Sequence, residues 1–263
     1  MSGMEQAGLL ALLLLAAACS KEAPPKPVVV EAAAGTSDLS RTLASFEAVA
    51  PAKGTIEGLV VFDGVPPDRV PINTSAEGGC GLDPNEPALT ETWVIHEARF
   101  ANVFVWLDNP PAHEAQVPSE ALVLRQRGCV YRPHALALRV GQKLEITNED
   151  RARHNVHALP RRNADFNISQ AEGAPAIETV FTTAENPLPI LCDLHPWMKA
   201  WVGVFDHPYY AVTGADGRFT LAGLPPGEYH LHAWHEVLGK LTASVTLAGD
   251  AGARICLTYK KKE

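Results

Sequence analysis

From Gly54 onward, short apolar runs alternate with turn residues about every 8–12 residues, and this spacing constrains the fold more than any other feature. Glycine, proline, asparagine or aspartate bound most of the runs, as is typical of strands. We predict an all-β chain of β-sandwiches, with strands at Thr55–Phe62, Trp93–His96, Ala101–Leu107, Leu122–Arg125, Ala135–Val140, Lys143–Asn148, Ala200–Phe205, Gly217–Leu221, Gly227–His235, Leu241–Leu247 and Ala253–Tyr259.

Composition agrees with this fold class and excludes one class of partner. The 263 residues include 20 glycines and 21 prolines, which suit many turns better than long helices. The 22 Lys and Arg against 30 Asp and Glu give a net charge of −8. A general nucleic-acid binder needs a basic surface, so we expect no nucleic-acid partner.

Residues 1–19 have the pattern of an export signal. The apolar run from Leu9 to Ala18 is too short to span a bilayer and ends at Cys19. It resembles a bacterial lipoprotein signal, which implies that Cys19 carries a lipid and anchors the chain to a membrane in the periplasm. Ser20 stands where inner-membrane retention would require Asp, so the resemblance to known sorting rules favours the outer membrane. Residues 1–8 contain no Lys or Arg, so an ordinary cleaved signal or a chain that is not exported remain alternatives.

Residues 20–53 are rich in proline, alanine and polar residues, so they bury little apolar area. We expect a flexible tether there, with a marginal helix over Leu39–Val49 that Ser37 or Asp38 caps.

The C-terminal part contains the patterns T-x-x-D-G-x-F, from Thr213 to Phe219, and L-P-P-G-x-Y, from Leu224 to Tyr229. These turns resemble the carboxypeptidase regulatory-like (prealbumin-like) β-sandwich. The early strand of that family resembles residues 54–60. We therefore infer one sandwich split between residues 54–118 and 207–263, with a second domain at 119–206 inserted. Three consecutive small units are the alternative.

The inserted region contains the residues with metal chemistry. Cys192, His195 and Met198 form a C-x2-H-x2-M loop, and His154-Asn155 lies upstream. A thiolate and two imidazoles with a weak axial thioether define a type 1 copper site.

Residues 119–206 resemble a cupredoxin with an amicyanin-like ligand loop, through Gly128–Pro133, Val140–Gln142, Asn148–Asp150, the His154-Asn155 pair and the ligand loop. The resemblance implies a Greek-key sandwich with one copper ion, Cu(I) or Cu(II), on His154, Cys192, His195 and Met198. It implies that Asn155 braces the ligand loop, and that Pro196 and Trp197 form an apolar shell around a partly exposed His195. The combination with a regulatory-like module resembles bacterial methylamine-utilisation or plastocyanin-like proteins.

Ordinary structural roles for these residues are the alternative at each position. Zinc is disfavoured, because a thioether is a poor zinc ligand. We expect His157 to be a partly exposed strand residue, not a ligand. A second metal site on His230, His232 and His235 is less favoured than structural or surface roles.

With Cys19 assigned to the lipid and Cys192 to copper, Cys80 and Cys129 remain as a candidate disulfide, which suits an oxidising periplasm. Two unpaired cysteines are the rival interpretation. Cys256 lies in an expected strand and is predicted to be a buried thiol.

These observations predict a non-enzymatic, single-electron carrier of the cell envelope that exchanges electrons with unidentified redox proteins through the exposed edge of His195. A copper-handling protein without electron transfer is the alternative. A structural envelope module with a degenerate site fits less well, because the four-ligand set is complete.

Overall fold

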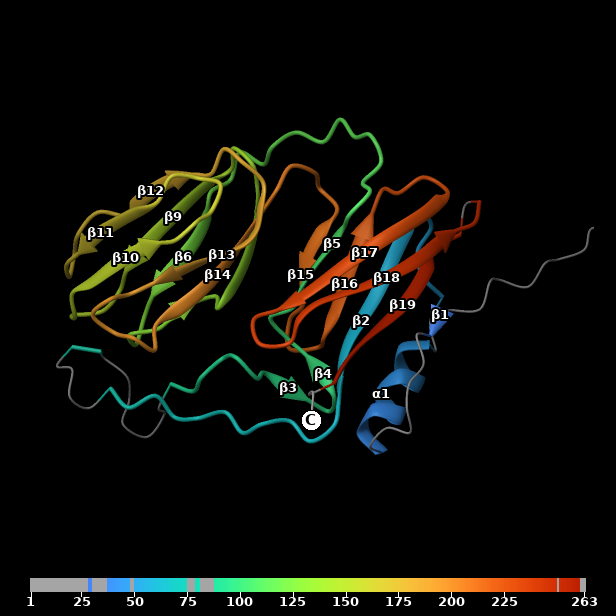
Figure 1. Ribbon diagram of the computed structural model, residues 1–263, viewed down its shortest axis with the longest axis horizontal. Coiled ribbons are helices and arrows are strands. Elements are labelled where there is room, and N and C mark those ends of the chain that lie inside the picture. Colours follow the sequence, from blue (N-terminus) through green and yellow to red (C-terminus); the bar gives the residue numbers. More distant parts are fainter. Residues whose placement is uncertain are drawn as a thin grey trace, which may run out of the picture.

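The computed structural model describes residues 28–29, 37–47, 50–74, 79–80, 88–249 and 251–260. Within these ranges it contains the helix α1 (Ser37–Glu47) and nineteen strands in four sheets. The all-β prediction is confirmed, and the sheets form two β-sandwiches that lie side by side (Figure 1). Among the described residues, no helix has the length and apolarity that a membrane crossing requires.

The central sandwich comprises residues 122–205. One sheet has the order β12-β9-β6-β7 and consists of β6 (Leu122–Gln126), β7 (Tyr131–Arg132), β9 (Lys143–Asn148) and β12 (Ile177–Val180). The other has the order β11-β10-β13-β14-β8 and consists of β8 (Ala135–Arg139), β10 (His154–Ala158), β11 (Phe166–Gln170), β13 (Glu185–Leu191) and β14 (Lys199–Phe205). Alternate apolar residues of both sheets fill the space between them, among them Leu124, Leu144, Ile146, Val156, Leu188, Ile190 and Val202.

The flanking sandwich is assembled from two separated parts of the chain. One sheet has the order β1-β19-β2-β4-β3, with β16 also paired to β2; it contains β1 (Val28–Val29), β2 (Thr55–Asp63), β3 (Ile95–His96), β4 (Arg99–Phe100), β16 (Arg218–Ala222) and β19 (Ala253–Lys260). The other has the order β15-β5-β17-β18 and contains β5 (Phe104–Leu107), β15 (Tyr210–Val212), β17 (Gly227–His235) and β18 (Gly239–Leu247). Strands from before the central sandwich thus pair with strands from after it in both sheets.

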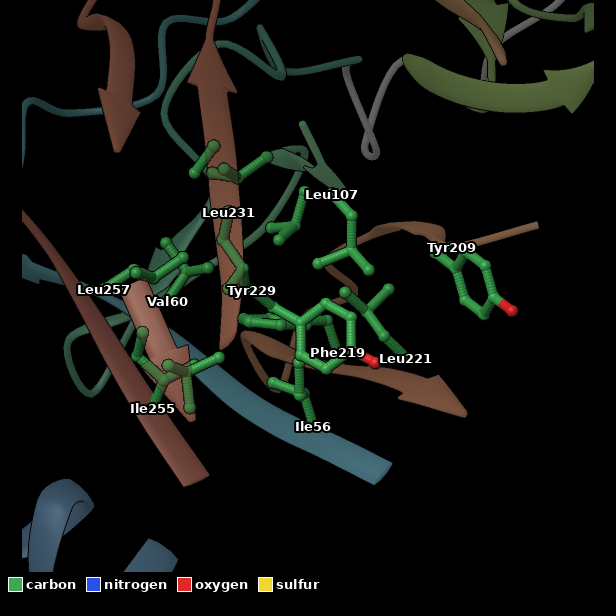
Figure 2. Packing of buried hydrophobic residues seen from close by; sticks show 14 of the residues in the cluster. Ile56, Val60, Leu107, Tyr209, Phe219, Leu221, Tyr229, Leu231, Ile255 and Leu257 are labelled. Carbon is green, nitrogen blue, oxygen red and sulfur yellow. The ribbon is translucent and has the colours of Figure 1, made fainter. Parts of the chain in front are cut away.

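The core of the flanking sandwich depends on strand β2, which is buried on both faces. Figure 2 shows Ile56 and Val60 of β2 directed into a cluster with Leu231 of β17 and Leu257 of β19. Gly58 leaves room for the ring of Phe219 on β16, because a Cβ atom at this position would lie 1.8 Å from that ring.

The other face of β2 is covered by α1. Leu39 and Phe46 of the helix are buried against Leu59 and Val61 of β2, and the Thr42 hydroxyl donates a hydrogen bond to the Glu97 carbonyl. A marginal helix is expected over Leu39–Val49 within a flexible tether, and α1 lies at Ser37–Glu47, where it packs its apolar side against β2. The predicted signal and Cys19 lie outside the described residues.

A polar cluster and an aromatic contact join the two sandwiches. The carboxylate of Glu236, in the β17–β18 connection, lies 2.6 Å from Nε2 of His134 and 2.5 Å from Nζ of Lys199. It also accepts a hydrogen bond from Trp201 Nε1, and the Trp201 ring lies 4.9 Å from that of Trp234. These contacts fix the orientation of the central sandwich on the flanking one.

Between β2 and β3, the described residues 64–74, 79–80 and 88–94 include a stretch that runs below the central sandwich in the view of Figure 1, and we name these residues the strap. Its two arms are hydrogen-bonded to each other through Val70, Ile72, Ala88 and Thr90. A disulfide links Cys80 of the strap to Cys129 of the central sandwich. The strap therefore ties the flanking sandwich to the part of the central one that contains His154.

Candidate metal centre

The expected ligands come from two neighbouring strands of one sheet. His154 begins β10, and Cys192 directly follows β13, which pairs with β10. His195 and Met198 lie in the loop between β13 and β14. Backbone hydrogen bonds close this loop, from Cys192 N to the Met198 carbonyl and from Met198 N to the His195 carbonyl. The pairing of the two strands brings these distant positions together.

Three of the donor atoms meet at one buried point. Nδ1 of His154 lies 3.0 Å from Nδ1 of His195, and Sγ of Cys192 lies 3.5 Å from that His195 atom. Two nitrogen ligands held about 2.0–2.1 Å from one ion lie about 3–3.6 Å apart, so this arrangement matches a shared metal. Met198 is also buried and belongs to the same apolar cluster as Cys192.

Asp150 orients His154 and was not assigned this role from the sequence. Nε2 of His154 lies 2.9 Å from Asp150 Oδ2, so this nitrogen carries the proton and Nδ1 is directed to the other ligands. The carboxylate also accepts hydrogen bonds from the backbone N–H groups of Gly128 and Cys129, at 2.6 and 2.9 Å. An acidic residue four positions before a ligand histidine is the signal that could have indicated it.

Protonation of the ligands favours a thiolate. Burial lowers the pKa of His154, but its hydrogen bonds with Asp150 and Cys192 outweigh burial and raise this pKa to about 9. Burial raises the pKa of the Cys192 thiol, but hydrogen bonds from His154 and from nearby backbone N–H groups bring it below its usual range. A metal ion that binds here replaces the proton shared by these groups.

Asn155 holds the ligand loop in place, as the cupredoxin resemblance implies. Its Oδ1 accepts hydrogen bonds from the backbone N–H groups of Asp193 and Leu194, at 2.7 and 3.3 Å, and lies 3.4 Å from Cys192 Sγ. Its Nδ2 donates to the Asp193 carboxylate and to Asn167. The loop is therefore fixed before any metal binds.

His195 is covered, which corrects the expectation of a partly exposed edge. Only 2% of its surface is exposed. A ring nitrogen of His195 and the two sulfurs of the Cys80–Cys129 disulfide lie within 4.8 Å of one another. The Trp197 ring lies 5.4 Å from the His195 ring, and its Nε1 donates to the Cys129 carbonyl. The strap supplies this cover from a distant part of the sequence, so the ligand-loop pattern does not indicate it.

Pro196 is exposed, and with Trp197 it borders a cavity of about 250 Å³ between the strap and the central sandwich. The other lining residues include Tyr131, His134 and Lys199. Tyr131 shares its hydroxyl proton between the carbonyls of Leu191 and Asn155, at 3.1 and 3.3 Å. It thereby joins the ends of the two ligand-bearing strands.

The other candidate residues lie apart from this centre or have structural partners. Cys256 is a buried thiol in β19. His157 lies half-buried on β10, with Nδ1 2.9 Å from the Asp193 carboxylate. Among the described residues, each group of three or more possible metal-binding side chains includes His154 or His195, so the alternating histidines of β17 form no such group.

Donor chemistry selects among metals. A thiolate and two imidazoles suit copper or zinc, and a buried methionine beside them favours copper, because thioethers are soft ligands that zinc binds poorly. The residues present therefore fit a copper ion.

Comparisons with known proteins found similar solved structures but no matching protein family or curated protein. No family model matches the chain, and no curated protein matches it. Among solved structures, the copper-containing nitrite reductase of Thermus scotoductus SA-01 is 21% identical with a TM-score of 0.32, over 38% of this chain and 26% of that one. An oxidised amicyanin variant with a proline replaced by alanine is 25% identical with a TM-score of 0.30, over 32% of this chain and 82% of amicyanin. A purple cupredoxin from Nitrosopumilus maritimus is 22% identical with a TM-score of 0.28, over 32% and 99%.

Proposed function

We propose that this protein is a type 1 copper protein that transfers single electrons in the bacterial cell envelope and is not an enzyme. One observation supports this above all: Nδ1 of His154, Nδ1 of His195 and Sγ of Cys192 converge in a buried space beside Met198. Copper bound there would accept and release one electron as it alternates between Cu(II) and Cu(I).

Electron transfer is favoured by a site whose geometry changes little between the two oxidation states. Asp150 fixes the ring of His154, and Asn155 fixes the loop that contains Cys192 and His195. Both supports are themselves hydrogen-bonded, so the ligands cannot easily rearrange when the charge changes. The energetic cost of reorganisation is thereby kept small.

The route for the electron differs from that of an exposed imidazole. Because His195 is covered, an electron exchanged at this end crosses the layer formed by Trp197 and the Cys80–Cys129 disulfide. Leu194, in the ligand loop, is 51% exposed and offers an apolar contact to a redox partner. Redox complexes of this kind use small, transient interfaces.

The compartment is proposed from two features. The lipoprotein-like signal would place a lipid on Cys19 and anchor the chain in the periplasm, with the outer membrane favoured. The disulfide between Cys80 and Cys129 is compatible with this assignment, because disulfides persist in oxidising compartments.

The absorption spectrum of the purified protein after addition of Cu(II) tests the proposal. We expect an intense visible band from thiolate-to-copper charge transfer, which ascorbate and the Cys192→Ala substitution both abolish. A colourless protein that binds no copper would refute the assignment.

A copper-handling role is the second candidate, because the cover over His195 suits retention of an ion as well as electron transfer. Two measurements distinguish these roles. In an electron carrier, the Met198→Gln variant keeps its copper and shows a shifted, reversible redox potential. In a handling protein, the wild type releases Cu(I) to a chelator.

A further inference from the structure

His195 belongs to two groups of possible metal ligands. One is the set with His154 and Cys192, and the other combines a His195 ring nitrogen with the sulfurs of Cys80 and Cys129, all within 4.8 Å of one another. All these side chains are buried, and the exposed fractions of Cys80 and Cys129 are 3% and 0%. In the second group the two sulfurs are joined to each other, so their capacity to bind metal depends on the state of this bond.

The dithiol state of these cysteines must exist before the bond forms. The contacts that hold them do not involve their sulfur atoms: Cys129 N donates to Asp150, the Cys129 carbonyl accepts from Trp197 Nε1, and the carbonyl of Gly79 accepts from Arg151 N. Packing against Ala152 and Trp197 is equally independent of the bond. The two thiols are therefore held near His195 by the fold itself.

The chemistry of this second group suits a soft monovalent ion. Two thiolates and one imidazole bind Cu(I) and also zinc, and the copper fit of the adjoining group with Met198 favours Cu(I). The surroundings of Ala152 and Trp197 are apolar and limit access of water. Because the His195 ring is common to both groups, an ion bound in the second group lies next to the ligands of the first.

We propose that the chain with Cys80 and Cys129 reduced binds one Cu(I) ion through these two thiolates and His195, as an entry site from which the ion passes to Cys192 and His154. After the ion has passed on, the Cys80–Cys129 bond forms by thiol–disulfide exchange with a disulfide of a partner protein. The two thiols form the Cys80–Cys129 bond and give two electrons and two protons to the partner, which leaves as a dithiol. The copper keeps its oxidation state, and the closed bond covers His195.

Cys192 is a ligand of the type 1 site but not of the entry site. The experiment therefore uses the full chain with Cys192→Ser, in which binding at the entry site can be measured by itself. The chain is unfolded with a phosphine reductant, refolded without oxygen and freed of the phosphine. Near-ultraviolet circular dichroism checks its fold against the disulfide form. Titration with Cu(I) in competition with bicinchoninate then measures binding. We expect one Cu(I) per reduced chain and none in the disulfide form.

Matched variants locate the ligands in the same background. Cys80→Ser and Cys129→Ser are expected to abolish binding, and His195→Ala to lose the ion to the competing chelator. Cys256→Ser removes a thiol of the flanking sandwich and is expected to leave binding unchanged. Oxidation of the loaded chain with glutathione disulfide should release Cu(I) from the Cys192→Ser variant and leave it bound in the wild type.

Three results would overturn the inference: equal binding by the disulfide form, binding that persists in Cys80→Ser, or a reduced chain that does not regain the fold. The reduced and disulfide forms have the same sequence, so the comparison between them tests the inference even if one of the substituted variants misfolds. The inference does not depend on electron transfer, because the visible band of the wild type tests that function separately.

Discussion

Asp150→Asn tests whether the carboxylate beside His154 positions the metal ligand. Asp150 accepts hydrogen bonds from three donors: Gly128 N, Cys129 N and, at 2.9 Å, His154 Nε2. Asparagine keeps one oxygen and places an NH2 group where the second oxygen lies. At least one buried N–H donor then faces another donor, and the oxygen that remains for His154 is uncharged and orients the ring less firmly.

The expected magnitude follows from these contacts. A buried donor without an acceptor costs about 1–3 kcal/mol. Loss of the carboxylate partner of a metal-binding histidine lowers metal affinity about 10- to 100-fold, which corresponds to about 1.4–2.8 kcal/mol. The first figure is a cost in folding stability and the second a loss of metal affinity, so we expect a drop of about 10- to 100-fold in copper affinity together with a somewhat less stable, still folded protein.

Competition of the protein with a chelator of known copper affinity measures this effect, and the visible band reports the geometry of the site. Glu149→Gln is the matched control, because Glu149 is exposed and forms a surface ion pair with Arg125 at 3.2 Å. We expect no change in affinity from the control. An affinity of Asp150→Asn within about twofold of the wild type would contradict the orienting role.

Three further predictions concern the strap and the junction of the sandwiches. Burial raises the pKa of Glu236, but its hydrogen bonds with His134, Lys199 and Trp201 outweigh burial and bring this pKa below its usual range, so Glu236→Gln should destabilise the protein by about 3–5 kcal/mol at pH 7. Because the folded-state pKa is depressed, this stabilisation is fully present above about pH 4.3 and is lost progressively as the pH falls below that value, so the difference in melting temperature between variant and wild type should be constant near neutral pH and shrink below about pH 4; a difference that does not shrink there would contradict this. The double substitution of Cys80 and Cys129 by serine opens a loop with a sequence separation of 49, so urea unfolding should show a loss of about 4 kcal/mol, and an unchanged midpoint would argue against it. Gly79→Ala requires a left-handed φ of 110° and puts a Cβ 2.9 Å from Ala152 N, so the strap should be displaced and copper should be lost faster to a chelator than from the wild type.

Strands with regular alternation were predictable from sequence. The expected Gly227–His235 and Lys143–Asn148 coincide with β17 and β9. β13 was not predicted, because its prolines, Pro187 and Pro189, argue against a strand that lies within a sheet. The edge strand β11 was also not predicted, since its residues are mostly exposed and give no apolar run.

The candidate ligands could be recognised from the sequence because three of them lie within one loop of seven residues. The residues that hold these candidate ligands in place were harder to predict. Asp150 acts through a contact with His154 that depends on the bend before β10, and Cys80 comes from a segment far earlier in the chain. Burial of His195 results from this second, long-range contact, so no local pattern could reveal it.

The split of the flanking sandwich accounts for the cover over the metal centre. The strap leaves the sheet at the end of β2 and returns to the same sheet at β3, so both of its ends are anchored in the flanking sandwich. The Glu236 cluster fixes the central sandwich against the opposite sheet. The part of the strap beside His195 is held by the central sandwich, through the Cys80–Cys129 bond and the hydrogen bond from Arg151 N to the Gly79 carbonyl. The flanking sandwich therefore supplies a segment that helps to bury the candidate metal centre, even though it contributes none of the expected ligands.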